Sequence, residues 1–400
     1  MRMSTVQIFQ QGVNNLLDRQ SDVTKTQEQL AAGKRILDAG DDPAGTVRIL
    51  NITSDLARID AYQRNTDTLQ GQLAVEENVL SSVISDLQRV RELTVQGNNA
   101  TMSPEDRQFI ATEISGILDS LVDRANTRDA SGEYIFGGFQ ADSQPFARTS
   151  TGVTYSGDDG RRFLQVSADG QIASRDSGQE VFMSARAGNG DFDYRAASGN
   201  TGTAKVSTTS ASSSYVPETY TVAFIQANPT DPITYTVTGD VSGQVATGNY
   251  AAGAAITFAG GEIRVEGTPA NGDRFTITSA ARQDVFTTVE DLINAFNISS
   301  DSPANDARIN NEASRGLVNL DNAIENILKI QSDVGTRMRR ADIQADTNDA
   351  FNLQLKETLS ELQDLDYAEA ISRLNIQMLA LQAAQQSFAK TQQMSLFNYL

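Results

Sequence analysis

Residues 316–341 read GLVNLDNAIENILKIQSDVGTRMRRA, and this stretch has the most regular pattern in the chain. Its apolar residues follow one another at steps of three and four, with one polar interruption. The positions are Leu317, Leu320, Ile324, Ile327, Gln331, Val334, Met338 and Ala341. Such heptads place an apolar stripe along one side of a helix, which a second helix must cover. The stretch predicts a long helix in a coiled-coil-like pair.

Helix signals continue on both sides of this stretch. Asp42-Pro43 is typical of an N-cap followed by proline in the first turn, and it predicts a helix running towards Asn98. Ser103-Pro104 repeats the signal for the next helix. After residue 341, Leu355, Leu359 and Leu362 continue the apolar pattern. Long helices are therefore expected before and after the centre of the chain.

Both ends of the chain carry the heptad step again. The N-terminal positions are Val6, Phe9, Val13, Leu16, Gln20, Val23, Gln27 and Leu30. The C-terminal positions are Ile371, Leu374, Met378, Leu381, Gln385 and Phe388. Each stripe covers only a few turns, and helices of this length are marginal alone in water. Both terminal helices therefore need a partner.

The centre has a different character from about residue 131. Gly and Asp pairs separate short apolar runs, which is typical of hairpins, and alternating Thr-rich stretches predict strands. We predict an α+β fold: a long antiparallel helical rod, coiled-coil-like with its N- and C-terminal segments paired, carrying β-hairpins and a small inserted all-β domain. The predicted parts are terminal helices at 1–30 and 371–400, a helical rod domain at 31–180 and 290–370 with hairpins at about 131–180, and an outer all-β domain at 181–289.

Composition removes several classes of function. The 400 residues include no His, Cys or Trp, which excludes Ser-His-Asp and Cys-His catalysis and imidazole or thiolate zinc sites. The net charge of −19 opposes binding to nucleic acid. The sequence has no run of about 18 apolar residues, which a membrane-spanning helix would need. The N-terminus lacks the pattern of a cleaved secretory signal. We expect no enzyme, no cofactor and no metal.

The C-terminal segment is poor in charge. After Glu369 there is no acidic residue, and the remaining charges are Arg373 and Lys390. A helix on a monomer surface normally carries more charge, although a helix packed inside its own domain need not. We favour burial against neighbouring subunits, and expect roughly the first and last 30 residues to be disordered in the isolated monomer. The predicted contact residues are Val6, Phe9, Val13, Leu16, Val23, Leu30, Ile371, Leu374, Met378, Leu381, Phe388, Leu396, Phe397, Tyr399 and Leu400.

Both ends also resemble a known family. The matching segments are AAGKRI (31–36), DDPAG (41–45), Asn65, LQRVRELTVQ (87–96) and DYAEAISRL (366–374). They resemble the flagellin superfamily, and the RMST start (2–5) with the SLFNYL end (395–400) is similar to its hook–filament junction members. The resemblance implies a structural subunit of the bacterial flagellum, secreted by type III export without a cleaved signal. It implies that the terminal helices pair in an inner tube.

The same resemblance implies the partners: copies of the chain in a ring, the hook-side junction protein, flagellin and a cytoplasmic export chaperone. Two alternatives stay open. In the first, the chain is a flagellin that forms the filament. In the second, it is a surface-exposed adhesive module whose Asp158-Asp159 and Asp191–Asp193 acids bind calcium. Acid pairs beside glycine are ordinary turn chemistry, so the calcium hypothesis is the weaker one.

Overall fold

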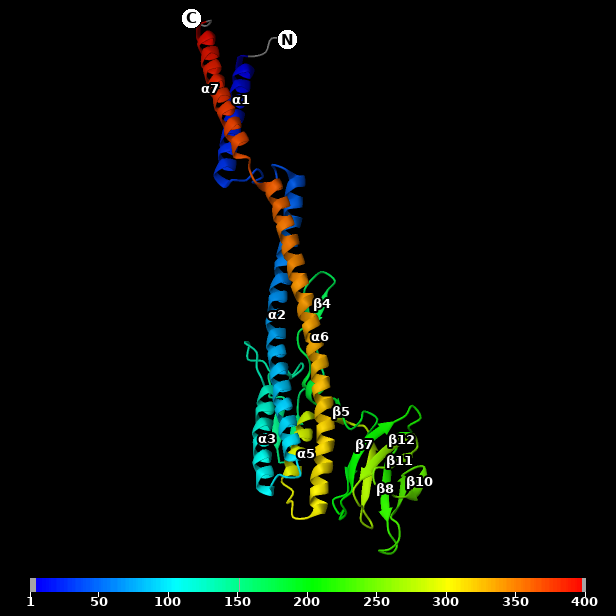
Figure 1. The fold of residues 1–400 in the computed structure, drawn as a ribbon. Helices are drawn as coiled ribbons and strands as arrows, with labels where there is room; N and C mark the ends of the chain where they lie inside the picture. Colours follow the sequence, from blue (N-terminus) through cyan, green and yellow to red (C-terminus); the bar gives the residue numbers. More distant parts are fainter. Residues whose placement is uncertain (1–4, 151, 398–400) are drawn as a thin grey trace. The chain divides into compact units, whose positions relative to one another are not determined.

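The computed structural model describes residues 5–150 and 152–397, and the side chains of residues 7, 9–150 and 152–390. The chain divides into two compact units, residues 1–65 with 343–400 and residues 66–342. The helices are α1 (Thr5–Ala32), α2 (Pro43–Gly97), α3 (Pro104–Ala125), α4 (Gly178–Phe182), α5 (Val285–Phe296), α6 (Pro303–Gln363) and α7 (Tyr367–Phe397) (Figure 1). Helices α2 and α6 contribute residues to both units.

Helices α2 and α3 begin at the residues that the sequence indicates. Asp42 accepts a hydrogen bond of 2.9 Å from the amide of Gly45 at the start of α2. Ser103 accepts one of 3.1 Å from the amide of Asp106 at the start of α3. Each side-chain oxygen satisfies an N–H that has no partner within the first helical turn. Local capping therefore fixes where the two helices start.

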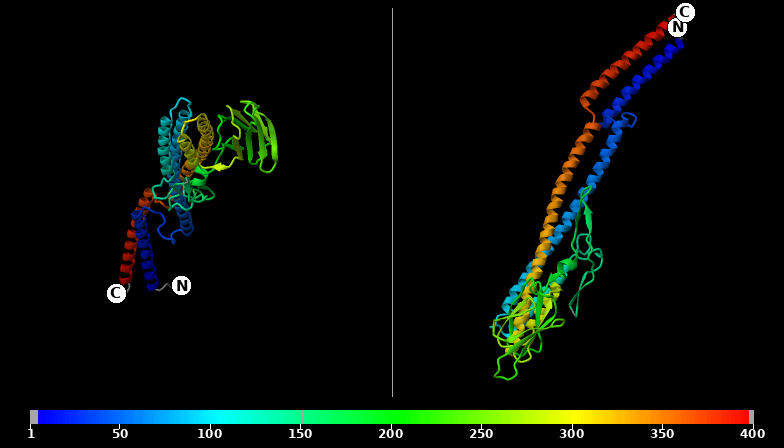
Figure 2. Two further views of the ribbon diagram at one scale, coloured as in Figure 1. Left: turned by 90° about the horizontal axis from the view of Figure 1, so that it is seen from below. Right: turned by 90° about the vertical axis from the view of Figure 1, so that its right-hand side faces the viewer.

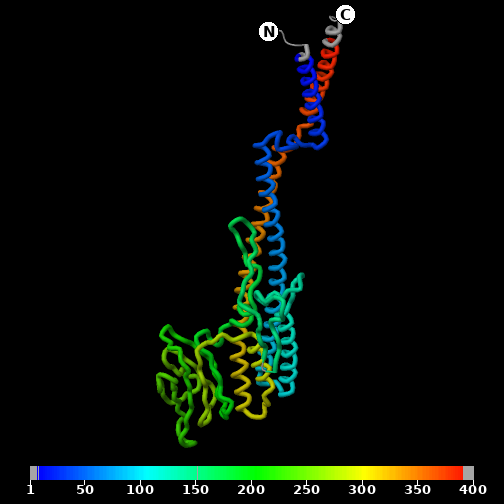
Figure 3. The backbone as a smooth tube through the Cα atoms, turned by 180° about the vertical axis from the view of Figure 1, so that it is seen from behind, coloured from blue at the N-terminus to red at the C-terminus, as the bar shows by residue number. Residues whose placement is uncertain are grey.

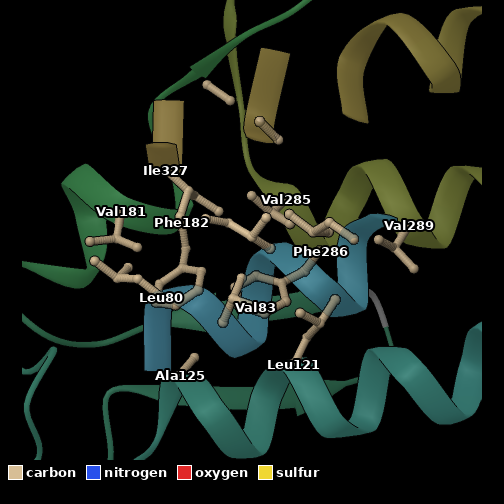
Figure 4. Close-up of a cluster of buried hydrophobic side chains, with 14 of the residues drawn as sticks. Leu80, Val83, Leu121, Ala125, Val181, Phe182, Val285, Phe286, Val289 and Ile327 are labelled. Atoms are coloured by element: carbon tan, nitrogen blue, oxygen red, sulfur yellow. The ribbon is translucent and has the colours of Figure 1, made fainter. Parts of the chain in front are cut away.

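The core of the larger unit lies between α2, α3, α5 and α6 (Figure 4). Leu80, Leu121, Phe286 and Ile327, one from each of these helices, are fully buried there. The ring centroids of Phe182 and Phe286 lie 5.6 Å apart in this core. The heptad residues 320, 327, 334 and 341 of α6 are buried, so the predicted stripe faces inward.

The strands of the larger unit form two sheets, two hairpins and one short pair. They are β1 (Phe146–Thr149), β2 (Gly152–Tyr155), β3 (Phe163–Gln165), β4 (Gln171–Ala173), β5 (Ala185–Arg186), β6 (Phe192–Ala196), β7 (Lys205–Ala211), β8 (Tyr220–Ile225), β9 (Thr234–Gly239), β10 (Gly243–Asn249), β11 (Ala255–Phe258), β12 (Gly261–Glu266), β13 (Arg274–Ser279) and β14 (Arg282–Gln283). The sheets are antiparallel, ordered β10-β9-β8-β13-β6 and β11-β12-β7. Strands β1–β2 and β3–β4 are the hairpins, and β5 pairs with β14.

The two sheets enclose a second core, separate from the helical one. Tyr220, Val222 and Phe224 alternate along β8 and are all fully buried. The rings of Tyr220 and Phe258 lie 5.0 Å apart and join the two sheets. Figure 3 follows the chain out of the helices into these strands and back into α5. The structure therefore confirms the predicted α+β class with an inserted all-β domain.

Helix α5 is the main difference from the expected layout. The expected boundary at 289/290 falls inside this helix, which starts two residues after β14. Val285, Phe286 and Val289 belong to the helical core rather than to the core between the sheets. Leu292 packs so closely on Gly316 of α6 that a Cβ there would lie 2.4 Å from its methyl group. These long-range contacts place α5 in the helical core rather than with the strands before it.

One side of α6 is polar although it is largely buried, and it holds the segment that leads into the β insertion. Asn311 accepts from the amide of Val206 and donates to the carbonyl of Ala204, at 2.9 and 3.0 Å. Four further residues on the same side make similar bonds to residues 180–193: Arg315, Asn319, Asn322 and Asn326. We call these five residues the α6 polar ladder.

Candidate assembly interface

Helices α1 and α7 lie antiparallel, side by side, in the smaller unit (Figure 2). Near their ends the ring centroids of Phe9 and Phe388 are 5.3 Å apart. The Phe388 ring covers Gly12, where a Cβ would lie 2.9 Å from it. Val23 is buried further along. The two short apolar stripes therefore cover each other, which meets the need for a partner that their length implies.

Polar contacts lock the other end of this helix pair. The amide of Arg35 donates to the carbonyl of Gln363 at 2.7 Å, and that of Leu365 donates to Gly33 at 3.1 Å. Thr26 donates to the side-chain oxygen of Gln377 at 2.7 Å. Gly33 has φ +68°, a conformation that favours glycine. These bonds join the two segments that connect the helix pair to α2 and α6.

An ion pair organises the loop after α1. The ammonium group of Lys25 lies 2.5 Å from the carboxylate of Asp41. The hydrogen bond from Lys25 lowers the pKa of Asp41, and the amides of Leu37 and Asp38 act in the same direction. Because half of the Lys25 side chain is exposed, this pair orders the loop more than it stabilises the fold.

The paired helices leave much of their apolar surface uncovered. Ile376 and Leu379 of α7 are 66% and 69% exposed, and Leu17 of α1 is 55% exposed. Ile371 and Met378 are half exposed as well. Burying a side chain of this size fully stabilises by about 1.5–3 kcal/mol, so a large part of that free energy is still available to a partner. Several exposed apolar residues so close together indicate an interaction surface.

The part of α6 in the smaller unit shows the same property. Ile343, Phe351 and Leu353 are 67%, 57% and 61% exposed. A shallow depression on this helix is lined by Ile343, Asp346, Thr347, Ala350, Phe351 and Gln354. On α2 of this unit, Val47 and Leu50 are also exposed. By contrast, Leu69, Leu73 and Leu80 of α2 in the larger unit are fully buried.

The structure divides the sequence-predicted contact residues into three groups. Val23 is buried, and six others are partly buried: Val13, Leu16, Leu30, Leu374, Leu381 and Phe388. Phe9, Ile371 and Met378 are about half exposed. Val6, Leu396 and Phe397 belong to helices, but their side chains lie outside the described residues, as do Tyr399 and Leu400 entirely. Their predicted contacts with neighbouring subunits stay a prediction.

Sequence reasoning missed two sets of residues here. Leu17, Ile376 and Leu379 lie off the heptad positions, and their signal was an excess of apolar residues on a short helix. Thr26 and Gln377 form a polar contact inside the helix pair, and no local pattern identifies that pairing. The first set faces outward and the second inward, so the heptad describes only the side that joins α1 to α7.

The described residues give no support to two other kinds of site. None of the described helices has the length and hydropathy needed to cross a membrane. Within the same residues, no three acidic side chains gather as they would around a metal ion. Asp158, one of the suggested calcium ligands, instead accepts bonds from the amides of Phe139 and Gly160, at 2.9 and 2.7 Å. It organises a loop, as acids beside glycine commonly do.

The two ends of the chain match known family models. Residues 3–141 match the bacterial flagellin N-terminal helical region, and residues 317–400 match the bacterial flagellin C-terminal helical region. These two segments contain α1, most of α6 and all of α7. The candidate interface therefore lies within the parts that the chain shares with flagellins.

Similarity over the full chain is to hook-associated proteins. The chain is 24% identical to the flagellar hook-associated protein 3 of Salmonella typhimurium over 397 residues, 99% of each chain. It is 33% identical to the crystal structure of flagellar hook-associated protein 3 from Legionella pneumophila, with a TM-score of 0.75, over 78% of this chain and 98% of that one. For FlgL from Xanthomonas campestris the identity is 31% and the TM-score 0.73, over 77% and 99%. The chain therefore belongs to the hook-associated protein 3 (FlgL) family, a family of structural flagellar proteins with flagellin-like ends.

Proposed function

We propose that this chain is the subunit that joins the flagellar hook to the filament, and that flagellin assembles upon it. The observation that carries the proposal is the set of apolar side chains left exposed on α1, α7 and the adjoining part of α6. A flagellin that forms the filament itself is the weaker alternative, since the family matched along the chain's length is that of hook-associated protein 3.

The exposed surface suits burial against other protein subunits. In the described part of α7 after Glu369, Arg373 and Lys390 are the only charged residues. Uncharged polar groups cost less to remove from water than charges do, and the centre of an interface is depleted in charge. Ile376 and Leu379 supply apolar area among them. Contacts between neighbours in a tube are heterologous, so one surface binds a different surface of the next subunit.

The partners follow from this role. Copies of the chain form a ring, the hook-side junction protein lies on one side and flagellin on the other. A cytoplasmic chaperone covers the apolar terminal segments before export, and the protein leaves the cell through the flagellar type III apparatus without loss of a signal peptide. Residues 181–289 face outward, whereas the segments 1–30 and 371–400 pair inside the tube. No part of this role requires catalysis.

A deletion strain tests the role directly. We expect cells that lack the protein to retain hooks, to lose attached filaments and to shed unpolymerised flagellin into the medium. Filaments that remain attached in the deletion strain would contradict the proposal. Complementation then tests the surface: Ile376→Glu should fail to restore filaments, because it replaces an exposed apolar side chain by a charge. Asn375→Glu adds the same charge at an exposed polar neighbour and should restore them.

A further inference from the structure

A buried carboxyl group in the larger unit has an oxygen without a partner. The Glu76 side chain on α2 is only 1% exposed. Its Oε1 accepts a hydrogen bond of 3.0 Å from the amide of Asp176, and its Oε2 is buried with no hydrogen-bond donor among the described residues. A carboxylate oxygen removed from water without a donor is costly. The site therefore needs either a cation or a proton at Oε2.

Among the described residues, the arginines nearest to Glu76 form their ion pairs with other acids. Asp176, in the segment before α4, pairs with Arg337 of α6 and, at 3.1 Å, with Arg161 from the segment before β3. Arg161 also pairs with Glu180 of α4. Two arginines therefore balance Asp176 and Glu180. An ionised Glu76 would add one unbalanced negative charge in a buried position.

The next charged group along the segment does not change this balance. Arg175 is buried and pairs with Asp129, and at 3.0 Å with Glu133. These two acids occupy its guanidinium group. Glu133 also pairs with Arg162, so the charges of the two arginines and the two acids in this second cluster balance one another. Arg337 is the α6 partner of Asp176.

We propose that Glu76 and Asp176 share one proton, and that this proton fastens residues 174–177 to helices α2 and α6. The proton resides on Glu76 and is donated from Oε2 to the carboxylate of Asp176, which pairs with Arg337 and Arg161. When hydroxide removes the proton, two negative carboxylates remain side by side in a buried site. Repulsion between them then loosens the segment. The attachment of residues 174–177 to the helices of the larger unit is therefore sensitive to pH.

The segment is well placed to transmit such a change. Residues 174–177 are all buried, and Ser177 is the N-cap of α4. Val181 and Phe182 of α4 pack into the helical core beside Leu80 of α2 (Figure 4). Loosening residues 174–177 therefore exposes part of that core. Burial, and then repulsion from Asp176, raise the pKa of Glu76 to about 8, while Arg337 opposes the rise.

The direction of the pH effect follows from this shift. In the unfolded chain the Glu76 pKa lies near 4.5, the ordinary value for a glutamate, which is below its value in the folded protein. Between these values the folded state binds the extra proton, so its stabilising contribution is complete below the unfolded pKa. The contribution is lost as the pH rises through the folded pKa. Opening of the segment should therefore become easier between pH 5 and pH 9.

Glu76→Gln is the decisive variant because an amide imitates the protonated acid. Its oxygen accepts from the amide of Asp176, and its NH₂ donates to the Asp176 carboxylate without titrating. Glu77→Gln is the matched control, since it removes the same charge from the adjacent position, where Glu77 accepts from Gln331 at 3.2 Å. Hydrogen exchange of residues 174–182 is measured from pH 5 to pH 9, corrected for the intrinsic exchange rate.

In the wild type and in Glu77→Gln, protection should fall with rising pH, by up to about tenfold per pH unit, as one linked proton allows. In Glu76→Gln it should stay constant. Equal pH profiles for the wild type and Glu76→Gln would overturn the proposal. If Glu76→Gln does not fold, infrared spectroscopy of wild-type protein with ¹³C-labelled glutamate tests instead whether a glutamate is protonated. A protonated glutamate band at pH 6.5 supports the shared proton, and its absence rejects it.

Discussion

The guanidinium group of Arg315 lies 3.2 Å from the carboxylate of Asp193, and both side chains are buried. Arg315 belongs to α6 and Asp193 to β6, so this contact joins the helices to the β insertion. Asp291 and Glu312 also bind Arg315, at 2.6 and 3.0 Å. Burial raises the pKa of Asp193, and Arg315 opposes the rise. Arg315 is therefore the member of the α6 polar ladder that forms ion pairs, and it forms three of them.

Arg315→Met should strongly destabilise the larger unit. It removes the one cation that Asp193, Asp291 and Glu312 share, and breaking a buried pair from one side costs about 3–5 kcal/mol. Chemical denaturation followed by tyrosine fluorescence measures the loss, since the chain has no Trp. Arg264→Met breaks an exposed pair with Glu262 and should cost at most about 1 kcal/mol. Equal losses of stability in the two variants would contradict the proposed importance of the buried Arg315 ion pairs.

Asn311→Ala should loosen the attachment of β7. The amide of Val206 and the carbonyl of Ala204 would lose their buried partner, at about 1–3 kcal/mol for each unsatisfied group. Hydrogen exchange at residues 204–206 should increase accordingly. Asn78→Ala is the control, because the Asn78 amide is exposed and bonds only within α2. Unchanged exchange at residues 204–206 in Asn311→Ala would show that the ladder does not hold the strand.

Phe351→Ala should weaken assembly while leaving the stability of the monomer nearly unchanged. The Phe351 side chain is 57% exposed on α6, so its removal should change the free energy of unfolding by less than about 0.5 kcal/mol. Binding of the purified protein to isolated hooks that carry the hook-side junction protein should weaken, because the apolar area there is lost. Phe286→Ala, at a fully buried position, should instead cost about 3–5 kcal/mol of stability. Normal hook binding by Phe351→Ala would place the interface elsewhere.

The terminal helices should be the first part of the monomer to be digested. Among the described residues of α1 and α7, the buried apolar side chains are Val23 and Ala370, which is a small core for two helices. Trypsin should therefore cut at Arg19 and Lys390 before it cuts at Arg89 and Arg91. The latter are similarly exposed, but they lie on α2 in the larger unit. Cleavage at all four sites at one rate would mean that the ends are as stable as the rest.

The predicted fold succeeded where the signal was local. The Ser103-Pro104 start of α3 and the heptads of residues 317–341 depend on side chains within a few residues of one another. Helix α5 was missed because its twelve residues follow the last strand almost directly and have no proline at the start. Its Asp284 cap gave the one local sign, and contact with α3 and α6 decided the rest.

The candidate interface was predicted only in part, for the same reason. Heptad spacing identified Val23 and Phe388, whose apolar neighbours recur along their own helix. It did not identify Ile376 or Leu379, because exposure depends on which helix faces are already covered. The contact residues at the extreme C-terminus, including Tyr399 and Leu400, lie outside the described residues and remain predictions.

The sequence by itself determined the class of this protein. Helical ends around a β centre, the absence of His and Cys and the flagellin-like motifs all follow from residue order, because capping and periodicity act over short distances. The tertiary structure alone decided which groups lose contact with water. Glu76 and Asp176 are 100 residues apart, and the bonds from the α6 polar ladder to residues 180–206 join residues that are still further apart. Their chemistry arises from burial, which no local pattern contains.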